Sequence, residues 1–163
     1  MTKIRGFEII SQKQFEYDTE CYMEATKYEE IKRPRRATKR SSGNDFYSLL
    51  DFVLKPGEDI LLPTGIKTYM LDDEELLLFP RSSIGFNYKI KIDNTIGKID
   101  SDYYGNPKNE GHIWIKLTNT GNKVWEVKKG DAIVQGTFYK YLVADNDDPL
   151  SEERVGGIGS TNN

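Results

Sequence analysis

The fold is decided by residues 88–93, Tyr88-Lys89-Ile90-Lys91-Ile92-Asp93, in which apolar and charged side chains alternate. Successive side chains of a β-strand point to opposite faces of a sheet, so this period of two indicates a strand with one buried face. Residues 113–117, Ile-Trp-Ile-Lys-Leu, repeat the pattern. We therefore expect two half-buried strands at these places.

Further short apolar runs lie on both sides of these stretches, and turn residues separate them. A Pro-Gly pair at residues 56–57 and a Pro-Thr-Gly break at residues 63–65 are two examples. Because turns recur at short spacing and no long helical period appears, an all-β sandwich, jelly roll or barrel is predicted. The further strand candidates are residues 6–10, 52–54, 60–62, 66–71, 76–79, 124–127 and 132–141.

Two regions interrupt this pattern. One short helix is expected to begin at Ser82 or Ser83, whose hydroxyl groups can cap backbone N–H groups. Residues 11–40 are charged and poorly periodic, and residues 17–32 within them could form a short helix or an ordered loop.

The end of the chain has a different composition from the rest. From about Asp145 it is rich in Asp, Gly and Ser, which predicts an arm outside the core. We expect a β domain at residues 1–150, in which residues 11–40 are a variable segment, and a glycine-rich arm at residues 151–163.

The composition excludes several classes of protein. The 163 residues include 23 basic and 26 acidic side chains, and the net charge of −3 gives no general attraction to nucleic acid. The single cysteine, Cys21, rules out an internal disulfide and indicates a reducing compartment. No apolar run approaches the roughly 20 residues that span a bilayer. We expect a cytoplasmic protein with no membrane and no nucleic-acid partner.

Two smaller features leave alternatives open. The basic residues in 32–40 could form a solvated arm, a subunit contact or a patch that attracts phosphate. The only histidine, His112, excludes a histidine metal site or a Ser-His triad as a unit. We expect His112 to be structural or exposed.

Residues 99–105, Ile-Asp-Ser-Asp-Tyr-Tyr-Gly, carry the strongest signal for chemistry, and a hairpin is predicted just before them at residues 93–98. Asp100 precedes Tyr103 by three residues. A carboxylate can hold and activate a water molecule, while the ring beside it can lie against a cyclic substrate. Alone, this segment is a weak signal.

Two further segments suit phosphate groups. Residues 81–83, Arg-Ser-Ser, offer a guanidinium, hydroxyls and a helix start, although an N-cap beside an unrelated arginine has the same sequence. Residues 156–161, Gly-Gly-Ile-Gly-Ser-Thr, allow close backbone approach but lack the Walker A ending. Arg154 on such an arm could meet the charge that develops on a phosphoryl group.

A metal ion would complete this chemistry. Asp100 faces anionic phosphates only if something offsets the repulsion, and Mg²⁺ does so while it polarises phosphate oxygens. Asp45 is a candidate Mg²⁺ partner through a water molecule, or else a turn aspartate near a glycine.

Together, these segments resemble the five motifs of the trimeric dUTPases, the dUTP nucleotidohydrolases. The resemblance runs from about Arg36 to Thr161. In chain order, the matching segments are residues 42–46, 80–83, 99–105, 130–135 and 154–161. Residues 36–39 and 106–111 look like enzymes of Gram-positive bacteria and their phages.

The resemblance implies a jelly roll that assembles as a homotrimer, with active sites between subunits. The implied reaction is hydrolysis of dUTP to dUMP and pyrophosphate with Mg²⁺. By position, Asp100 would activate the water, Tyr103 would lie under the deoxyribose, and Asn94 would lie near the uracil. Arg154 would act on the closing arm. The other substrate-binding positions would be Arg81, Ser82, Ser83, Gly97, Ile99, Gln135, Ile158, Gly159, Ser160 and Thr161, with Asp45 near the metal.

Three of the chain's departures from the family pattern are single residues. Ile158 stands where the arm usually carries a phenylalanine, so an aliphatic cover would replace stacking on uracil. Asn44 replaces an aromatic residue, and Tyr104 replaces an arginine.

Two other functions are weighed against this one. The dCTP deaminases share the fold, the Arg-Ser-Ser segment and the hairpin but act on the base with a glutamate, and no deaminase motif is recognisable here. A phage dUTPase with a regulatory protein partner is the other alternative, with residues 11–40 as the binding surface.

Overall fold

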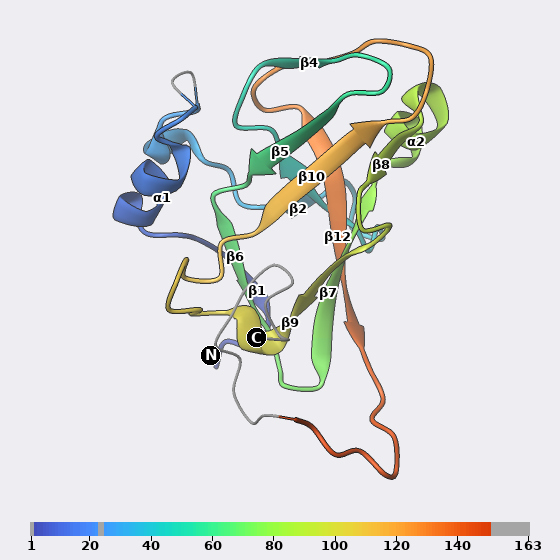
Figure 1. The fold of residues 1–163 in the computed structure, drawn as a ribbon. Helices are drawn as coiled ribbons and strands as arrows, with labels where there is room; N and C mark the ends of the chain where they lie inside the picture. Colours follow the sequence, from blue (N-terminus) through green and yellow to red (C-terminus); the bar gives the residue numbers. More distant parts are fainter. Residues whose placement is uncertain (1, 23–24, 151–163) are drawn as a thin grey trace.

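The computed structural model describes residues 2–22 and 25–150, and these residues are mainly β (Figure 1). The all-β prediction is confirmed. The strands are β1 (Gly6–Ile9), β2 (Arg35–Arg36), β3 (Asn44–Tyr47), β4 (Phe52–Leu54), β5 (Asp59–Pro63), β6 (Ile66–Tyr69), β7 (Glu74–Pro80), β8 (Ile90–Ile92), β9 (Gly97–Asp100), β10 (Trp114–Asn119), β11 (Trp125–Val127) and β12 (Ala132–Lys140). The helices are α1 (Gln12–Thr19) and α2 (Ser82–Tyr88), with short 3-10 turns η1 (Tyr28–Glu30) and η2 (Ser101–Tyr103).

The strands form two larger sheets and two pairs, all antiparallel. The largest sheet has the order β2-β3-β12-β7-β9, and a second has the order β5-β10-β8. β1 pairs with β6, and β11 pairs with β4. Most of these neighbours are distant in the sequence, which gives the distorted jelly roll expected for this chain.

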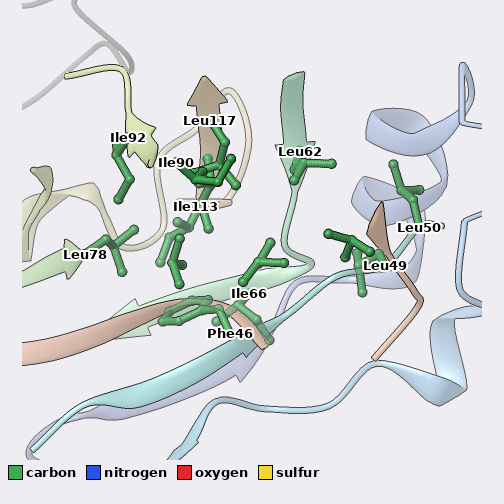
Figure 2. Close-up of a cluster of buried hydrophobic side chains, with 14 of the residues drawn as sticks. Phe46, Leu49, Leu50, Leu62, Ile66, Leu78, Ile90, Ile92, Ile113 and Leu117 are labelled. Carbon is green, nitrogen blue, oxygen red and sulfur yellow. The ribbon is translucent and has the colours of Figure 1, made fainter. Parts of the chain in front are cut away.

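The core lies between the two larger sheets (Figure 2). Phe46 and Leu78 from the five-stranded sheet face Ile90, Ile92 and Leu117 from the three-stranded sheet, and all five are buried. The period-two pattern that predicted the strands therefore marks the faces that make this core.

Helix α2 begins at Ser82, as expected, but neither serine is its N-cap. The N-cap of α2 is Arg81, whose side chain makes no capping bond, and both serines lie inside the first turn. The serine-cap prediction was therefore wrong. Tyr88 ends α2 instead of starting a strand, and Lys89, with a φ of 56°, turns the chain into β8.

Helix α1 begins earlier than residues 17–32 suggested, and together with α2 it is one of two α-helices within residues 2–22 and 25–150. Its N-cap is Ser11, whose hydroxyl accepts a hydrogen bond from the Gln14 N–H at 3.2 Å. Phe15 is the side chain that α1 buries in the core. A single apolar anchor gives little helical periodicity, which explains why the sequence pattern was weak there.

The turn at residues 93–96 also differs from the prediction. The strands beside it do not pair with each other: β8 pairs with β10, whereas β9 pairs with β7. The expected hairpin is instead a passage from one sheet to the other.

Residues 141–150 continue from β12 with no helix or strand and run away from the sheets (Figure 1). Leu142 and Leu150 in this segment are fully exposed. No helix in the described part of the chain is long and apolar enough to cross a membrane.

Candidate functional site

A cavity of about 480 Å³ opens where the chain passes from β8 to β9. Apolar side chains of both sheets form part of its wall. Leu78 comes from the five-stranded sheet, and Ile92, Ile115 and Trp114 come from the three-stranded sheet. Five residues that the sequence analysis selected also line it: Asn94, Gly97, Ile99, Asp100 and Tyr103. The structure therefore brings the predicted base, sugar and water-activating positions together in one chain.

Gly97 has a steric reason to be glycine in this wall. A Cβ at this position would lie 3.0 Å from the Cβ of Leu78 on the paired strand β7. The absence of a side chain lets β9 lie against β7 while Leu78 fills the core below the cavity.

Tyr103 is buried and held at its hydroxyl end. Its O–H donates to the His112 carbonyl oxygen at 3.0 Å, and the Asn109 amide donates to the Tyr103 hydroxyl at 2.7 Å. Gly111 packs against the same residue: a Cβ on Gly111 would lie 2.4 Å from the Tyr103 carbonyl oxygen, and the φ of Gly111 is +83°. The loop of residues 109–112 thus fixes the ring beside the cavity.

Asp100 lies at the end of β9 and is 39% exposed, so water can reach its carboxylate. Lys98 Nζ lies 3.9 Å from Asp100 Oδ1 and 2.9 Å from Glu75 Oε2. Glu75 is the residue opposite Asp100 in the register of β7 and β9. The contact in which Lys98 donates to the Glu75 carboxylate raises the pKa of Lys98, and the charges of Glu75 and Asp100 act in the same direction. Desolvation opposes this effect but does not cancel it. Lys98 therefore stays charged and offsets two neighbouring carboxylates.

The predicted phosphate and metal positions form a second cluster on the same large sheet. Arg81 Nε lies 3.2 Å from Asp45 Oδ1, and Gln135 on β12 is paired in register with Asp45 on β3. Ser82 and Ser83 follow in the first turn of α2, with both side chains exposed. The cluster offers a cation, an amide and two hydroxyls at one place on the surface.

The two clusters lie at opposite ends of β7. Asp100 pairs with Glu75 near the start of that strand, whereas Arg81 follows its last residue, Pro80. At about 3.3 Å per residue the separation is roughly 20 Å. Helix α2 and the yellow turn after β9 mark the two ends (Figure 1). One chain does not bring Asp100 and Arg81 to the same phosphate group.

Some predicted positions fall outside the described residues: Arg154, Ile158, Gly159, Ser160 and Thr161. Over residues 2–22 and 25–150, no group of three or more His, Cys, Asp and Glu side chains is placed to hold a metal ion. Asp45 is the only predicted metal partner, and it already contacts Arg81. These residues alone do not make a cage for Mg²⁺.

Sequence reasoning missed a buried pair behind the cavity. His112 is 0% exposed, as its expected structural role requires; its Nε2 accepts the Gly65 N–H at 2.8 Å, and its Nδ1 lies 2.6 Å from Asp18 Oδ2. Burial lowers the pKa of His112, although the Asp18 carboxylate acts in the opposite direction. The ring is therefore neutral at pH 7, with its proton on Nδ1. Its place between Gly111 and an apolar strand was the signal available in the sequence.

Comparisons with known proteins agree on one family. The family model described as dUTPase matches residues 29–162. The deoxyuridine 5'-triphosphate nucleotidohydrolase of Lactococcus lactis is 40% identical over 162 residues, 98% of each chain. The enzyme of the same name from Haemophilus influenzae is 34% identical and covers 80% of this chain and 87% of its own.

Solved structures give the same result. The dUTPase of Streptococcus mutans superimposes with a TM-score of 0.68 at 34% identity, over 86% of this chain and 98% of its own. A dUTPase from the Staphylococcus aureus phage phi11, solved with a structural Mg(II) ion, has a TM-score of 0.65 at 16% identity. It covers 92% of this chain and 99% of its own, and this likeness concerns the fold alone.

Proposed function

The chain belongs to the dUTPase family, and we propose that it hydrolyses dUTP to dUMP and pyrophosphate. The observation that carries this proposal is the cavity between the two sheets, which has Asp100 and Tyr103 in its lining. The dCTP deaminase alternative has no support in the comparisons, which name dUTPases.

Asp100 is the proposed general base. Its carboxylate is open to water and lies at the cavity, so it can accept a proton from a water molecule that attacks a phosphoryl group. Lys98 contributes by offsetting the charge of Glu75 and Asp100. In-line attack by water needs position and charge neutralisation but no covalent nucleophile, which fits these residues.

The cavity is the proposed site of the base and the sugar. Asn94, at the turn between β8 and β9, would lie near the uracil, where backbone groups can read its edge. Gly97 and Ile99 would line the wall. The fixed ring of Tyr103 would lie under the deoxyribose and leave no room for a 2′-hydroxyl, which gives selectivity against UTP.

We propose a homotrimer with shared sites, and the separation of the two clusters supports the sharing of each site between chains. Because Asp100 and Arg81 lie roughly 20 Å apart along β7, each site would take its cavity from one subunit and Arg81, Ser82, Ser83 and Gln135 from another. We propose that residues 151–163 close the site as an arm of the third subunit. Arg154, Gly159, Ser160 and Thr161 would contact the phosphates, and Ile158 would cover the uracil.

Mg²⁺ is proposed to arrive with the substrate. Mg²⁺ in nucleotide enzymes usually keeps several waters and binds substrate phosphates with one or two carboxylates, so no complete protein cage is needed. Asp45 beside the phosphate-binding Arg81 can accept a hydrogen bond from a water molecule of that ion. When bound, the ion would neutralise the triphosphate and polarise its oxygens.

Incubation with Mg²⁺ and dUTP, with dCTP, dTTP and UTP in parallel, tests the proposal. We expect dUMP and pyrophosphate from dUTP and no comparable turnover of the other three. Release of ammonia from dCTP would support a deaminase instead. Absence of dUTP turnover by a folded trimer would overturn the proposed function.

A further inference from the structure

Helix α1 and the residues beside it are joined to the loop that fixes Tyr103. The Ser11 N–H and O–H donate to the two carboxylate oxygens of Glu110 at 3.0 and 2.5 Å. Asp18 pairs with His112, and the Tyr22 O–H donates to the Leu61 carbonyl oxygen at 2.7 Å. These contacts all reach residues in or beside the lining of the cavity, which includes Leu61 and Tyr103.

The Asp18–His112 contact is the deepest of these. Both ring nitrogens of His112 have partners: Nδ1–H donates to Asp18 Oδ2 at 2.6 Å, and Nε2 accepts from the Gly65 N–H at 2.8 Å. Asp18 and the Gly65 N–H together fix the proton on Nδ1, because a carboxylate accepts an N–H and a backbone N–H needs an unprotonated nitrogen. With the proton on the other nitrogen, both contacts would be lost and a buried backbone N–H would have no acceptor.

The backbone of His112 connects the position of its ring to that of Tyr103. The carbonyl oxygen of His112 accepts the Tyr103 O–H, and the preceding Gly111 lies so close to Tyr103 that even a Cβ does not fit. A shift of His112 therefore changes the direction of the Tyr103 hydroxyl and of its ring.

We propose that Asp18 and His112 are positioning residues that hold Tyr103 in the orientation which rejects ribonucleotides. This inference rests on the proposed dUTP hydrolysis and adds a role for the N-terminal segment in sugar selectivity. Asp18 reaches the substrate only through His112 and Tyr103, so its loss affects discrimination between dUTP and UTP more than the chemical step at Asp100.

A double-mutant cycle tests the connection. The variants are Asp18→Ala, Tyr103→Phe, which keeps the ring but removes its hydroxyl, and the double variant, and the readout is kcat/KM for dUTP divided by kcat/KM for UTP. We expect each single variant to lower this ratio about tenfold, the size of one lost hydrogen bond. The double variant should lose no more than the larger single loss, because residues that act through one another are not additive.

A conservative variant separates orientation from simple packing. Asp18→Asn keeps an acceptor for the Nδ1–H of His112, so we expect it to retain most of the selectivity that Asp18→Ala loses. Thr19→Val is the matched control in the same helix. The Thr19 hydroxyl donates to the Phe15 carbonyl oxygen at 2.7 Å and not to His112. We expect Thr19→Val to lower Tm and to leave the dUTP/UTP ratio unchanged.

Three results would overturn the inference: a wild-type ratio in Asp18→Ala, additive losses in the double variant, or an equal loss in Thr19→Val. Absence of dUTP turnover in the wild-type protein would instead overturn the proposed function. In that case the nitrogen-15 spectrum of the single histidine still tests whether Asp18 accepts the Nδ1–H of His112. We expect a proton on Nδ1 in the wild type and a shifted Nδ1 resonance in Asp18→Ala, because that N–H loses its acceptor, and an identical spectrum would refute the pair.

Discussion

The two ends of strand β7 carry two different kinds of site. At one end, Tyr103 is buried and bonded twice at its hydroxyl, and apolar side chains of two sheets complete the cavity. At the other end, Arg81 is 38% exposed and contacts Asp45 through a single ion pair on the surface. If the proposed function holds, the base and sugar site would be built within one chain, whereas the Arg81 cluster would be one part of a site shared between chains.

This difference follows from what each part must recognise. A neutral base and sugar are distinguished by shape, which needs rigid walls and buried hydrogen bonds. A triphosphate is recognised by charge, and an exposed ion pair of about 0–1 kcal/mol can exchange one anionic partner for another at little cost. In the proposed trimer the cavity would be complete before assembly, while the Arg81 cluster would act only together with a neighbouring subunit.

Replacement of Asp100 by Asn should have the largest effect. The amide keeps the size of the side chain but does not accept the proton of the attacking water, so kcat should fall about 10²- to 10⁴-fold. Binding of dUTP should change little, because the cavity walls remain. Steady-state kinetics with an isothermal binding assay would measure both quantities, and Asp102→Asn serves as the control. Turnover close to that of the wild type would remove Asp100 from its proposed role.

Replacement of Arg81 by Ala should come next, with a loss of about 10²- to 10³-fold when one phosphate donor is removed. The two weak variants can then be combined in mixed trimers, made by co-expression with different tags. If Asp100 and Arg81 of one site come from different chains, random mixing regenerates about one quarter of the sites with both residues intact. Mixed trimers with no recovered activity would show that both residues serve the site from the same chain.

Sequence reasoning succeeded where local periodicity reports burial. The alternation in residues 88–93 and 113–117 identified strands that face the core, and the segment with Asp100 and Tyr103 lies at the cavity as expected. It misjudged Tyr88, because a tyrosine next to Ile90 and Ile92 continues the alternation although Lys89 has already reversed the chain with a positive φ.

The failures concern features that depend on distant parts of the chain. The strands around residues 93–96 were read as a hairpin, yet each finds a partner in another sheet. Helix α1 has one core side chain and relies on partners such as Glu110 and His112, nearly a hundred residues away. Local patterns carry no information about such contacts, and the distance between Asp100 and Arg81, which the family resemblance implied only as a site between subunits, came from the register of β7.

Replacement of Gly111 by Ala tests whether the rigidity of the cavity end is real. The left-handed backbone and a contact of 2.4 Å with the Tyr103 carbonyl oxygen should together lower the free energy of unfolding by about 2–4 kcal/mol. Gly105→Ala is the matched control, since Gly105 has a φ of +73° but nothing within 4 Å of the added carbon. It should cost about 1 kcal/mol, from the backbone alone.

Urea unfolding of both variants, with dUTP kinetics on each, would measure this difference. Equal losses of stability at Gly111 and Gly105 would mean that the loop yields to the added carbon. In that case Tyr103 is not held as tightly as its contacts indicate, and the contrast between the two ends of β7 would weaken.

The smallest effect should come from pH, and it also belongs to the cavity end. Burial lowers the pKa of His112 below its ordinary value of about 6.5, so the unfolded chain binds a proton more readily than the folded protein does. The free energy of unfolding should therefore fall as the pH drops through about 6.5, by at most about 1.4 kcal/mol per pH unit.

Carboxylates whose pKa is lowered by folding affect stability in a lower pH range. The hydrogen bonds from Ser11 and the contact with Lys67 lower the pKa of Glu110 to about 2, so its contribution is intact above pH 5 and is lost only in stronger acid. The slope between pH 5 and 6.5 is then the signature of the single histidine. In His112→Gln the chain should be less stable but its stability should no longer change across this interval. A slope that survives in His112→Gln would assign the titration to another group and leave the pair behind Tyr103 without its predicted neutral histidine.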